Sequence, residues 1–317
     1  MTNKPLIGVS SCLLGQPVRY DGGHKHARYI TDELSAHFDF LPVCPEVAIG
    51  LGIPRPTIRL RRIGGDIRLV DGKDDSLDYT DRMREFADGL MPDLAGLSAY
   101  IFKKGSPSCG MTRVPVVDQP DRPRSYDGRG IFCEAFKARY PLVPTEEEGR
   151  LNDPAIRENF FERVFAWHRW QQLDEHSVSG FIGYHAAHKL MLMARGGHCY
   201  AELGRLVAGV RREDLPSRRR EYIQRFMEIM AEHPDRGRQV NVLMHVMGYF
   251  KKSLDGHDKQ ELLRLFEAYK AGDVPLVAPL ILLKHHLRVF PDPYLQTQHY
   301  LDPFPESLAL RSVIHNG

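Results

Sequence analysis

The sequence predicts two domains, an α/β domain with an open, mainly parallel, Rossmann-like sheet and then an all-α domain. In the first part of the chain, three apolar runs at 6–10, 38–43 and 99–102 have strand character, and each breaks into a turn. Beyond about residue 150, successive segments have helical periodicity instead. Strands that alternate with helices are typical of a parallel sheet, whereas helical segments alone indicate an all-α domain.

The first domain also contains the helices and the hairpin that such a sheet needs. Apolar residues from Met83 to Leu94 recur at spacings of three and four, which predicts an amphipathic helix over 79–97 that covers the sheet. A hairpin-like piece at 67–70 precedes this helix, with Asp71 and Gly72 as its turn. The run GIFCEAF predicts the last helix of the domain.

The segment TEEEGRLNDP marks the boundary, with domains at 1–148 and 149–317. Asp153 is the expected N-cap of a new helix, and Pro154 fits its first turn. Both tryptophans follow this boundary, as do all of the fifteen histidines except His24, His26 and His37. The predicted helices of the second domain cover 155–173, 178–195, 200–207, 218–233, 238–254, 259–271 and 277–289.

Composition excludes several classes of protein. With 42% hydrophobic and 26% charged residues, the 317-residue chain has an ordinary globular composition. The apolar stretch at 275–283 is far shorter than the roughly 20 residues of a membrane helix, and no secretory leader is visible. Five cysteines without disulfide-like spacing fit a reducing compartment, so we expect a cytoplasmic protein. The first turn, GVSSCLLG, lacks the dinucleotide-binding fingerprint, and no phosphate-binding Walker loop occurs.

Three cysteines, Cys12, Cys44 and Cys109, follow the three strand-like runs. Because ligands bind at the carboxyl ends of strands in an open parallel sheet, we expect these thiols to lie together and to hold a metal centre. A structural zinc or iron–sulfur site usually takes four protein ligands, whereas three ligands leave one position open. A cubane cluster would then present one free iron to a sulfur donor. Three buried, inert thiols are the alternative interpretation.

Polar residues beside the cysteines are the candidate catalytic groups. Glu46 follows Cys44 by two residues, so both side chains point the same way on an extended backbone, with an ordinary surface glutamate as the alternative. Ser106 lies in the Cys109 loop, where its hydroxyl either orients substrate or shapes the turn. The loop RYDGGHKH offers Asp21 as a second acid/base group and Lys25 as an anion contact, with an ordinary turn as the alternative.

The second domain contains a cationic region that predicts nucleic-acid binding, with an ordinary solvated surface as the alternative. Trp167 and Trp170 are either base-stacking or core residues. His185 and His188 have a spacing that suits a metal, but helix packing or RNA contact is the favoured interpretation. The candidate phosphate contacts, besides Lys25, are Arg211, Arg212, Arg218, Arg219, Arg220, Lys251 and Lys252.

The motifs VSSCLLGQPVRYDG, VCPEVAIGLGIPRP, KKGSPSCG and YDGRG together resemble the thiouracil desulfidase (TudS-like) family over about residues 5–145. The resemblance implies a 4Fe-4S cluster on Cys12, Cys44 and Cys109, whose unique iron captures the thiocarbonyl sulfur of a thiopyrimidine. The base then leaves with oxygen in place of sulfur. Cys133 and Cys199 lie outside these motifs and are predicted to be structural.

The second half contains FIGYHAAHKLMLMARG, NVLMHVMGYFKKSL and PLILLKHHLRVF, and it resembles the YbgA-type domain over about 155–312. The fusion resembles the RudS-type proteins, which implies 4-thiouridine within tRNA as the substrate. Two other functions stay open at this stage. One is a desulfidase of free thiouracil or a small thiopyrimidine, and the other is a non-catalytic iron–sulfur protein that binds nucleic acid.

Overall fold

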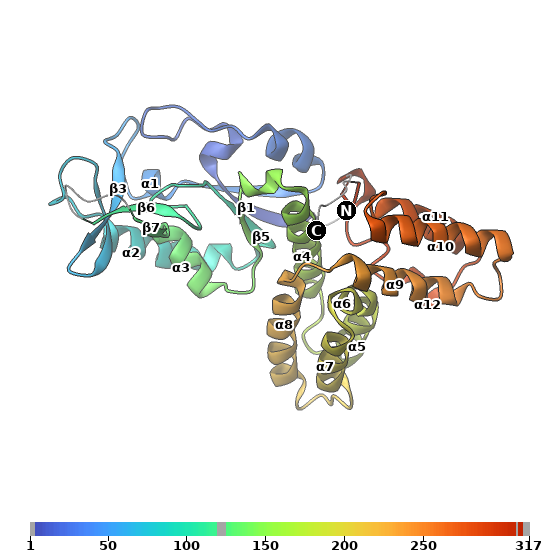
Figure 1. Cartoon of the computed structure of the whole chain (residues 1–317). Coiled ribbons are helices and arrows are strands. Elements are labelled where there is room, and N and C mark those ends of the chain that lie inside the picture. The colour runs from blue at the N-terminus through green and yellow to red at the C-terminus, as the bar shows by residue number, and fades with distance from the viewer. Residues whose placement is uncertain (1–3, 119–124, 309, 313–317) are drawn as a thin grey trace. The chain divides into compact units, whose positions relative to one another are not determined.

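The computed structural model describes residues 4–118, 125–308 and 310–312. The chain divides into two compact units, Met1–Asn152 and Asp153–Gly317 (Figure 1). Every strand of the described part lies in the first unit, and helices α4 to α12 belong to the second. The predicted order, an α/β fold followed by helices, is therefore confirmed.

The first unit is built around a four-stranded parallel sheet in the order β2-β1-β5-β8. Ile7 in the central strand β1 pairs with Phe40 on one side and with Ala99 on the other. All four residues of β5 are buried, as in parallel strands covered on both faces. The strands are β1 (Leu6–Ser10), β2 (Asp39–Val43), β5 (Ala99–Phe102) and β8 (Thr145–Glu147).

Aromatic side chains join this sheet to the helix α3 (Ile131–Arg139), and Phe86 of α2 (Thr80–Leu90) in turn contacts Phe132 of α3. The ring of Tyr100 stacks on that of Phe102 with centroids 4.0 Å apart, and both rings contact Phe132 of α3. The predicted helix over 79–97 ends earlier than expected, because a 3-10 turn at Met91–Leu94 follows α2. These contacts fix α3 against the strand that leads to Cys109.

A second, mixed sheet has the order β4-β3-β6-β7. The chain does turn after Asp71, whose Oδ1 accepts from Lys73 N at 2.8 Å, and an isolated antiparallel bridge then joins Val70 to Asp78. The hairpin of β3 and β4, which was not predicted, turns at Gly64 and Gly65. Both glycines have positive φ, 59° and 95°, a conformation that favours glycine in two-residue hairpin turns. The strands are β3 (Ile58–Ile63), β4 (Asp66–Asp71), β6 (Val114–Val117) and β7 (Ser125–Gly128).

The second unit is helical, and its first helix begins at the predicted cap. Asp153 Oδ1 accepts hydrogen bonds from the backbone N–H groups of Ala155 and Ile156, at 2.8 and 3.1 Å. The helices are α4 (Pro154–Gln171), α5 (Val178–Ala187), α6 (Lys189–Arg195), α7 (Gly197–Val207), α8 (Leu215–Ala231), α9 (Arg236–Tyr249), α10 (Gly256–Ala271), α11 (Val277–Val289) and α12 (Pro293–Gln296).

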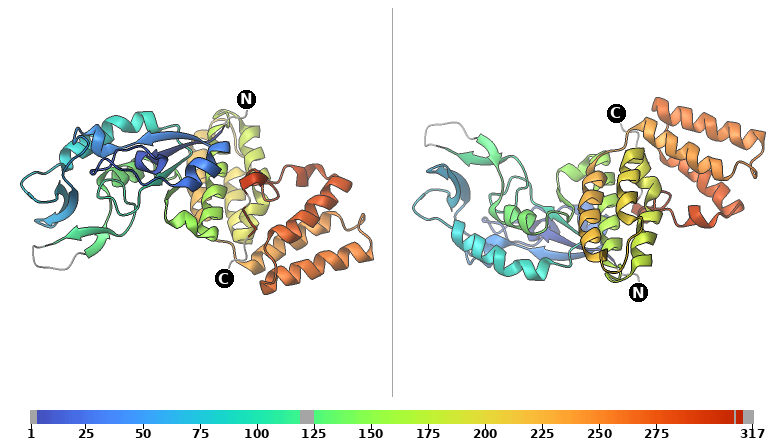
Figure 2. Two further views of the ribbon diagram at one scale, coloured as in Figure 1. Left: turned by 90° about the horizontal axis from the view of Figure 1, so that it is seen from above. Right: turned by 90° about the horizontal axis from the view of Figure 1, so that it is seen from below.

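Two details of this unit differ from the prediction. The helix expected over 178–195 breaks at His188, which separates α5 from α6, and α12 was not foreseen. Helices α4 to α8 pack as one group, from which α9 to α12 extend, and α6 contacts α9 (Figures 1 and 2). None of the helices in the described residues combines the length and the apolar character that crossing a bilayer requires.

Candidate metal centre and catalytic cavity

The parallel sheet brings the three cysteine loops to one edge. Strands β1, β2 and β5 run in the same direction, so the loops that follow them emerge together. Cys12 lies in the 3-10 turn Ser11–Leu14, and Cys44 is the N-cap of the short helix α1 (Pro45–Ala48). Cys12, Cys44 and Cys109 all line one cavity of about 350 Å³. Their predicted convergence is thus present in the fold.

Burial and mutual proximity keep these thiols protonated when they carry no metal. Burial raises the pKa of Cys12 to about 11, and Cys44 contributes to the rise. Burial, and then the charge of Glu46, raise the pKa of Cys109 well above its usual value, while a hydrogen bond from Ser10 lowers it. Ser10 is itself held by the backbone N–H of Lys103, 3.0 Å from its Oγ. Metal binding would therefore displace protons from the thiols.

The donor set suits an iron–sulfur cluster. Cys12, Cys44 and Cys109 each offer one sulfur donor to the cavity, and in a cluster each thiolate binds its own iron. Soft thiolates favour iron–sulfur clusters, and the cations Arg19, Lys25, Lys103 and Arg55 line the same cavity. Their charge would offset that of the thiolates.

Glu46 lies at the centre of a hydrogen-bonded set in this cavity. Its Oε2 receives hydrogen bonds from Arg55 Nη2 at 2.6 Å and from Arg55 Nε at 3.1 Å. Its Oε1 receives a hydrogen bond from Ser108 Oγ and a longer one, 3.4 Å, from Ser106 Oγ. The side chain of Arg55 is only 2% exposed. The carboxylate is therefore fixed at both oxygens and paired with a cation away from solvent.

Ser106 shapes the Cys109 loop and also faces Glu46. Its Oγ accepts hydrogen bonds from the backbone N–H groups of Ser108 and Cys109, at 3.3 and 3.1 Å. Ser106 lines the cavity as well. The turn-forming and the substrate-facing interpretations of this serine are therefore compatible.

Asp21 lies apart from this set. Its side chain is 53% exposed, and it is not among the residues that line the cavity. The backbone N–H of Gly23 donates to Asp21 Oδ1 at 3.0 Å, which lowers the pKa of that carboxyl below its usual value. Its acid/base role stays a prediction, and the geometry favours Glu46. Lys25, from the same loop, does line the cavity.

Two residues that sequence reasoning missed support the site. Arg55 belongs to the motif GIPRP, where nothing in the sequence signals its pairing with Glu46. Gly130, in the motif YDGRG, precedes α3 and packs on the Cys109 loop. A Cβ at Gly130 would stand 2.4 Å from the carbonyl carbon and oxygen of Ser108 and 2.6 Å from Cys109 N. Only glycine permits this approach of the two backbones.

The predicted phosphate contacts in the helical unit differ in exposure. Arg211, Arg212, Arg220, Lys251 and Lys252 are exposed. Two others are engaged within the unit: Arg218 pairs with Asp214 at 2.9 Å, and Arg219 is buried against the Trp170 ring. The exposed residues are therefore the ones available to RNA.

The tryptophan and histidine candidates lie mainly in the core. Trp170 is 9% exposed and stacks on Tyr222, with ring centroids 5.8 Å apart. His185 Nδ1 lies 3.2 Å from the hydroxyl of Tyr222, and His188 Nδ1 lies 2.8 Å from the carbonyl oxygen of Tyr184. Burial lowers the pKa of His185 to about 4. These contacts favour helix packing over a metal site.

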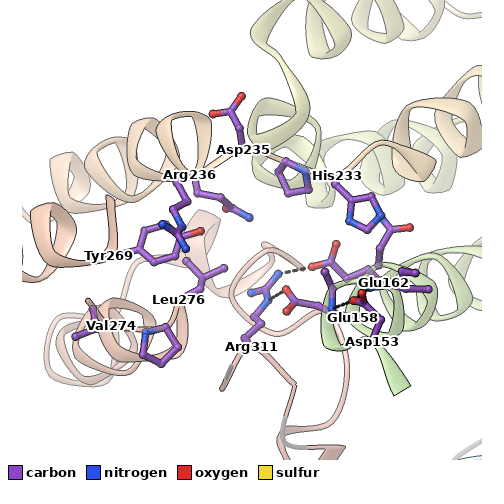
Figure 3. A pocket seen from close by; sticks show the side chains of 16 residues that line it. Asp153, Glu158, Glu162, His233, Asp235, Arg236, Tyr269, Val274, Leu276 and Arg311 are labelled. Carbon is purple, nitrogen blue, oxygen red and sulfur yellow. Dashed lines mark hydrogen bonds and ion pairs between the residues drawn. The ribbon is translucent and has the colours of Figure 1, made fainter. Parts of the chain in front are cut away.

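The helical unit holds a cavity of its own, of about 590 Å³. Three of its charged side chains pair with one another: Arg311 lies 2.5 Å from Glu162 and 3.4 Å from Glu158 (Figure 3). Glu162 also pairs with Arg195 at 2.8 Å. Asp153 and Asp235 cap α4 and α9. This ion-pair network holds Arg311 against α4.

Fold and site together define an α/β protein with a three-cysteine cavity, joined to a helical unit. The family model described as 2-thiouracil desulfurase matches residues 7–148, and that described as a protein of unknown function (DUF1722) matches residues 189–305. The chain belongs to the 2-thiouracil desulfurase family through its first part and to the YbgA-type (DUF1722) family through its second. Membership of the first family indicates an enzyme.

Individual relatives match one half of the chain each. Uncharacterized protein YbgA of Escherichia coli (strain K12) is 35% identical over 159 residues, which cover 49% of this chain and 92% of YbgA. Uncharacterized protein YbbK of Bacillus subtilis (strain 168) is 33% identical over 158 residues, 47% of this chain and 99% of YbbK. The solved structure of the [4Fe-4S]-dependent thiouracil desulfidase TudS is 35% identical, with a TM-score of 0.38, over 47% of this chain and 95% of that one.

Proposed function

We propose that this protein is an iron–sulfur-dependent desulfidase that replaces the thiocarbonyl sulfur of a thiolated uridine with oxygen, and that its substrate is 4-thiouridine in tRNA. The observation that carries this proposal is the cavity in which Cys12, Cys44 and Cys109 meet Glu46 and Ser106. Residues 1–148 would catalyse the reaction, and residues 149–317 would bind tRNA. The cytoplasm, where thiols stay reduced and tRNA occurs, is the proposed location.

The three cysteines would hold a 4Fe-4S cluster. Bound there, the cluster would supply one iron without a protein ligand, a Lewis acid with affinity for sulfur. The overall reaction needs only water: the carbon–sulfur double bond of the base is replaced by a carbon–oxygen double bond, and the sulfur leaves as sulfide. No electrons are gained or lost.

Glu46 is the proposed base that takes a proton from the attacking water. Arg55 holds one oxygen of its carboxylate at 2.6 Å, so the base would already be in place when water attacks. Ser106 and Ser108 hold the other carboxylate oxygen and orient it toward the cavity. The cations Arg19, Lys25 and Lys103 would stabilise the negative charge that develops as sulfide leaves.

The test uses protein purified without oxygen, with iron and sulfide measured before assay. Incubation with bulk tRNA that contains 4-thiouridine is expected to release sulfide and to remove the near-ultraviolet absorbance of the thionucleoside. The Cys12→Ala, Cys44→Ala and Cys109→Ala variants should each lose iron and activity together. A protein with full iron content that attacks no thiolated substrate would contradict the proposal.

A second candidate substrate is a free thiopyrimidine, because the matching family model is described as 2-thiouracil desulfurase. In that case the helical unit would serve another purpose. Parallel assays with free 2-thiouracil and 4-thiouracil separate the two candidates. Reaction of the free bases without any reaction of tRNA would favour the second one.

A further inference from the structure

An aromatic and cationic surface in the helical unit is the feature that carries a further inference. It consists of Lys189, Tyr200, His245, Tyr249 and Tyr294, from α6, α7, α9 and α12, and we call it the aromatic–lysine surface. We propose that it binds unpaired bases and phosphates of RNA. The proposal rests on the proposed function, because it identifies where the helical unit would contact the tRNA substrate.

The members of this surface form a continuous chain of ring and cation contacts. Lys189 Nζ lies 5.3 Å from the ring centroid of Tyr200 and 5.8 Å from that of Tyr294. The Tyr294 ring stacks on that of Tyr249 at 5.3 Å and 18°, and His245 meets Tyr249 edge-on at 5.6 Å. Tyr249 is 41% exposed. A ring that other rings hold in place is pre-ordered for stacking on a base.

Charge on this surface is positive and largely uncompensated. Lys189 makes no ion pair with any residue in the described parts of the chain. No Asp or Glu occurs in residues 176–201, which contain α5, α6 and the start of α7. None occurs in residues 236–254 either, which contain α9. The second stretch ends with the exposed pair Lys251 and Lys252. The facing acidic residue, Asp292, caps α12 by accepting from Leu295 N at 2.9 Å.

The surface also offers a polar atom for a ligand. His245 Nε2 is buried and has no hydrogen-bond partner among the described residues. His245 packs near Lys189, and burial and that cation lower its pKa, so the imidazole is neutral and can donate or accept a hydrogen bond. Aromatic faces, lysines and a neutral imidazole match nucleotides, which present a π-face, a phosphate and hydrogen-bonding edges.

The test is the affinity of the full-length protein for an unmodified, fluorescently labelled tRNA transcript, measured by anisotropy at several salt concentrations. The Tyr249→Ala variant should bind about tenfold more weakly with an unchanged salt slope, because one stacked base is lost. Tyr249→Phe keeps the ring and should bind like the wild type. Lys189→Ala should weaken binding and reduce the slope by about one.

Matched controls are Tyr126→Ala, which removes a tyrosine that is 63% exposed in the other unit, and Lys270→Ala on α10. Both controls should bind tRNA like the wild type. Every variant should keep the iron content and the melting temperature of the wild type, which shows that the protein is folded and its cluster is present.

The outcomes separate this surface from the proposed function. If Tyr249→Ala binds tRNA as tightly as the wild type does, and both proteins desulfidate it, the RNA-binding role of the aromatic–lysine surface is overturned. The proposed desulfidase function then stands. If binding depends on Tyr249 but tRNA is not desulfidated, the substrate assignment falls and the surface stands. If the wild type binds no tRNA, both are overturned.

Discussion

The role proposed for Glu46 as a base depends on surroundings that fix both oxygens of its carboxylate. The Arg55 guanidinium binds one carboxylate oxygen, and the two serine hydroxyls bind the other. A water molecule in the cavity would meet a carboxylate that needs no rearrangement to accept its proton. A base that is already in the right position lowers the barrier, because it does not have to be oriented during the reaction.

Replacement of Glu46 by glutamine removes this base but keeps its shape. Glu46→Gln should retain its iron and lose about 100-fold or more in rate, the usual contribution of a general base. The measurement is sulfide release per iron, under saturating substrate. Glu134→Gln, an exposed position on α3, is the matched control and should stay active.

Folding of the Glu46 variant needs a separate check, because Arg55 loses its ionic partner away from solvent. Thermal unfolding of the variant measures that effect. A Glu46→Gln protein with unchanged iron, an unchanged melting temperature and full activity would remove this residue from the mechanism.

Sequence reasoning identified the cavity residues with a proposed chemical role more readily than the residues that hold them in place. The cysteines and Glu46 were predicted because strand ends and a two-residue spacing are visible along the chain. The pairing of Arg55 with Glu46 was missed, because it depends on how the chain returns after α1 and has no local pattern. The close packing of Gly130 on the Ser108 carbonyl and the Cys109 amide was missed for the same reason.

At the scale of elements, the start of α3 supports the Cys109 loop. The backbone N–H groups of Ile131 and Phe132 donate to Pro107 O and Ser108 O, at 3.3 and 3.0 Å. Gly130 lets the helix approach this closely. The position of Cys109, a proposed cluster ligand, thus depends on a helix that contributes no cysteine to the cavity.

A methyl group at Gly130 should separate α3 from this loop. Its backbone φ of −61° suits alanine, so any effect of Gly130→Ala comes from the contact with Ser108 and Cys109 and not from backbone strain. We expect the purified variant to contain less iron and to be less active. Iron content per protein, determined without oxygen, is the measurement.

Gly89→Ala is the control for this prediction, because a Cβ at Gly89 in α2 would have no atom within 4 Å. This change should keep the iron, and alanine is favoured over glycine inside a helix by roughly 1 kcal/mol. Equal iron in the Gly130→Ala and wild-type proteins would show that the loop tolerates the displacement.

The strands and helices themselves were predicted unevenly. The three strands of the parallel sheet that lead into the cysteine loops were found because they are short apolar runs followed by turns. The second sheet was mostly missed, since β3 reads IRLRRI and its arginines pair with acids from distant loops, such as Arg62 with Asp118. In the helical unit, α5 and α6 share one continuous periodicity, so the break at His188 has no sequence signal.

Buried histidines near that break make the helical unit sensitive to acid. Burial lowers the pKa of His299 to about 3 and that of His185 to about 4, and it lowers the pKa of His188 well below the usual value. The unfolded chain takes up protons at these sites below about pH 6.5, whereas the folded unit does not. The contribution of these histidines to the free energy of unfolding is therefore fully present above pH 6.5, and it is lost as the pH decreases toward their pKa values in the folded unit.

The expected loss is about 1.4 kcal/mol per pH unit for each histidine that stays neutral. Urea unfolding followed by tryptophan fluorescence measures it, because both tryptophans belong to the helical unit. His299→Gln should reduce the slope of stability against pH between 6.5 and 5, whereas His257→Gln, at an exposed position, should not. Identical slopes for His299→Gln and the wild type would contradict this account.

For the whole molecule, the proposed division of labour assigns chemistry to one unit and RNA binding to the other. The cavity that holds the three thiols is lined by residues of the first unit only. The aromatic–lysine surface belongs to the second unit, and so do the exposed candidates for phosphate contact, Arg211, Arg212, Arg220, Lys251 and Lys252. Under this proposal a free base would need only the first unit, whereas a tRNA would need both.

Salt should therefore affect the two substrates differently. Counterion release lowers RNA affinity with a slope of roughly −0.7 to −0.9 per phosphate contacted, so three contacts would lower kcat/KM for tRNA roughly 20- to 40-fold between 50 and 200 mM salt. A free thiouracil carries no phosphate, and its kcat/KM should change little over that range. Because the same enzyme preparation and cluster serve both assays, damage to the cluster by salt would lower both rates together. A common salt dependence would show that the helical unit does not recruit the RNA through its phosphates.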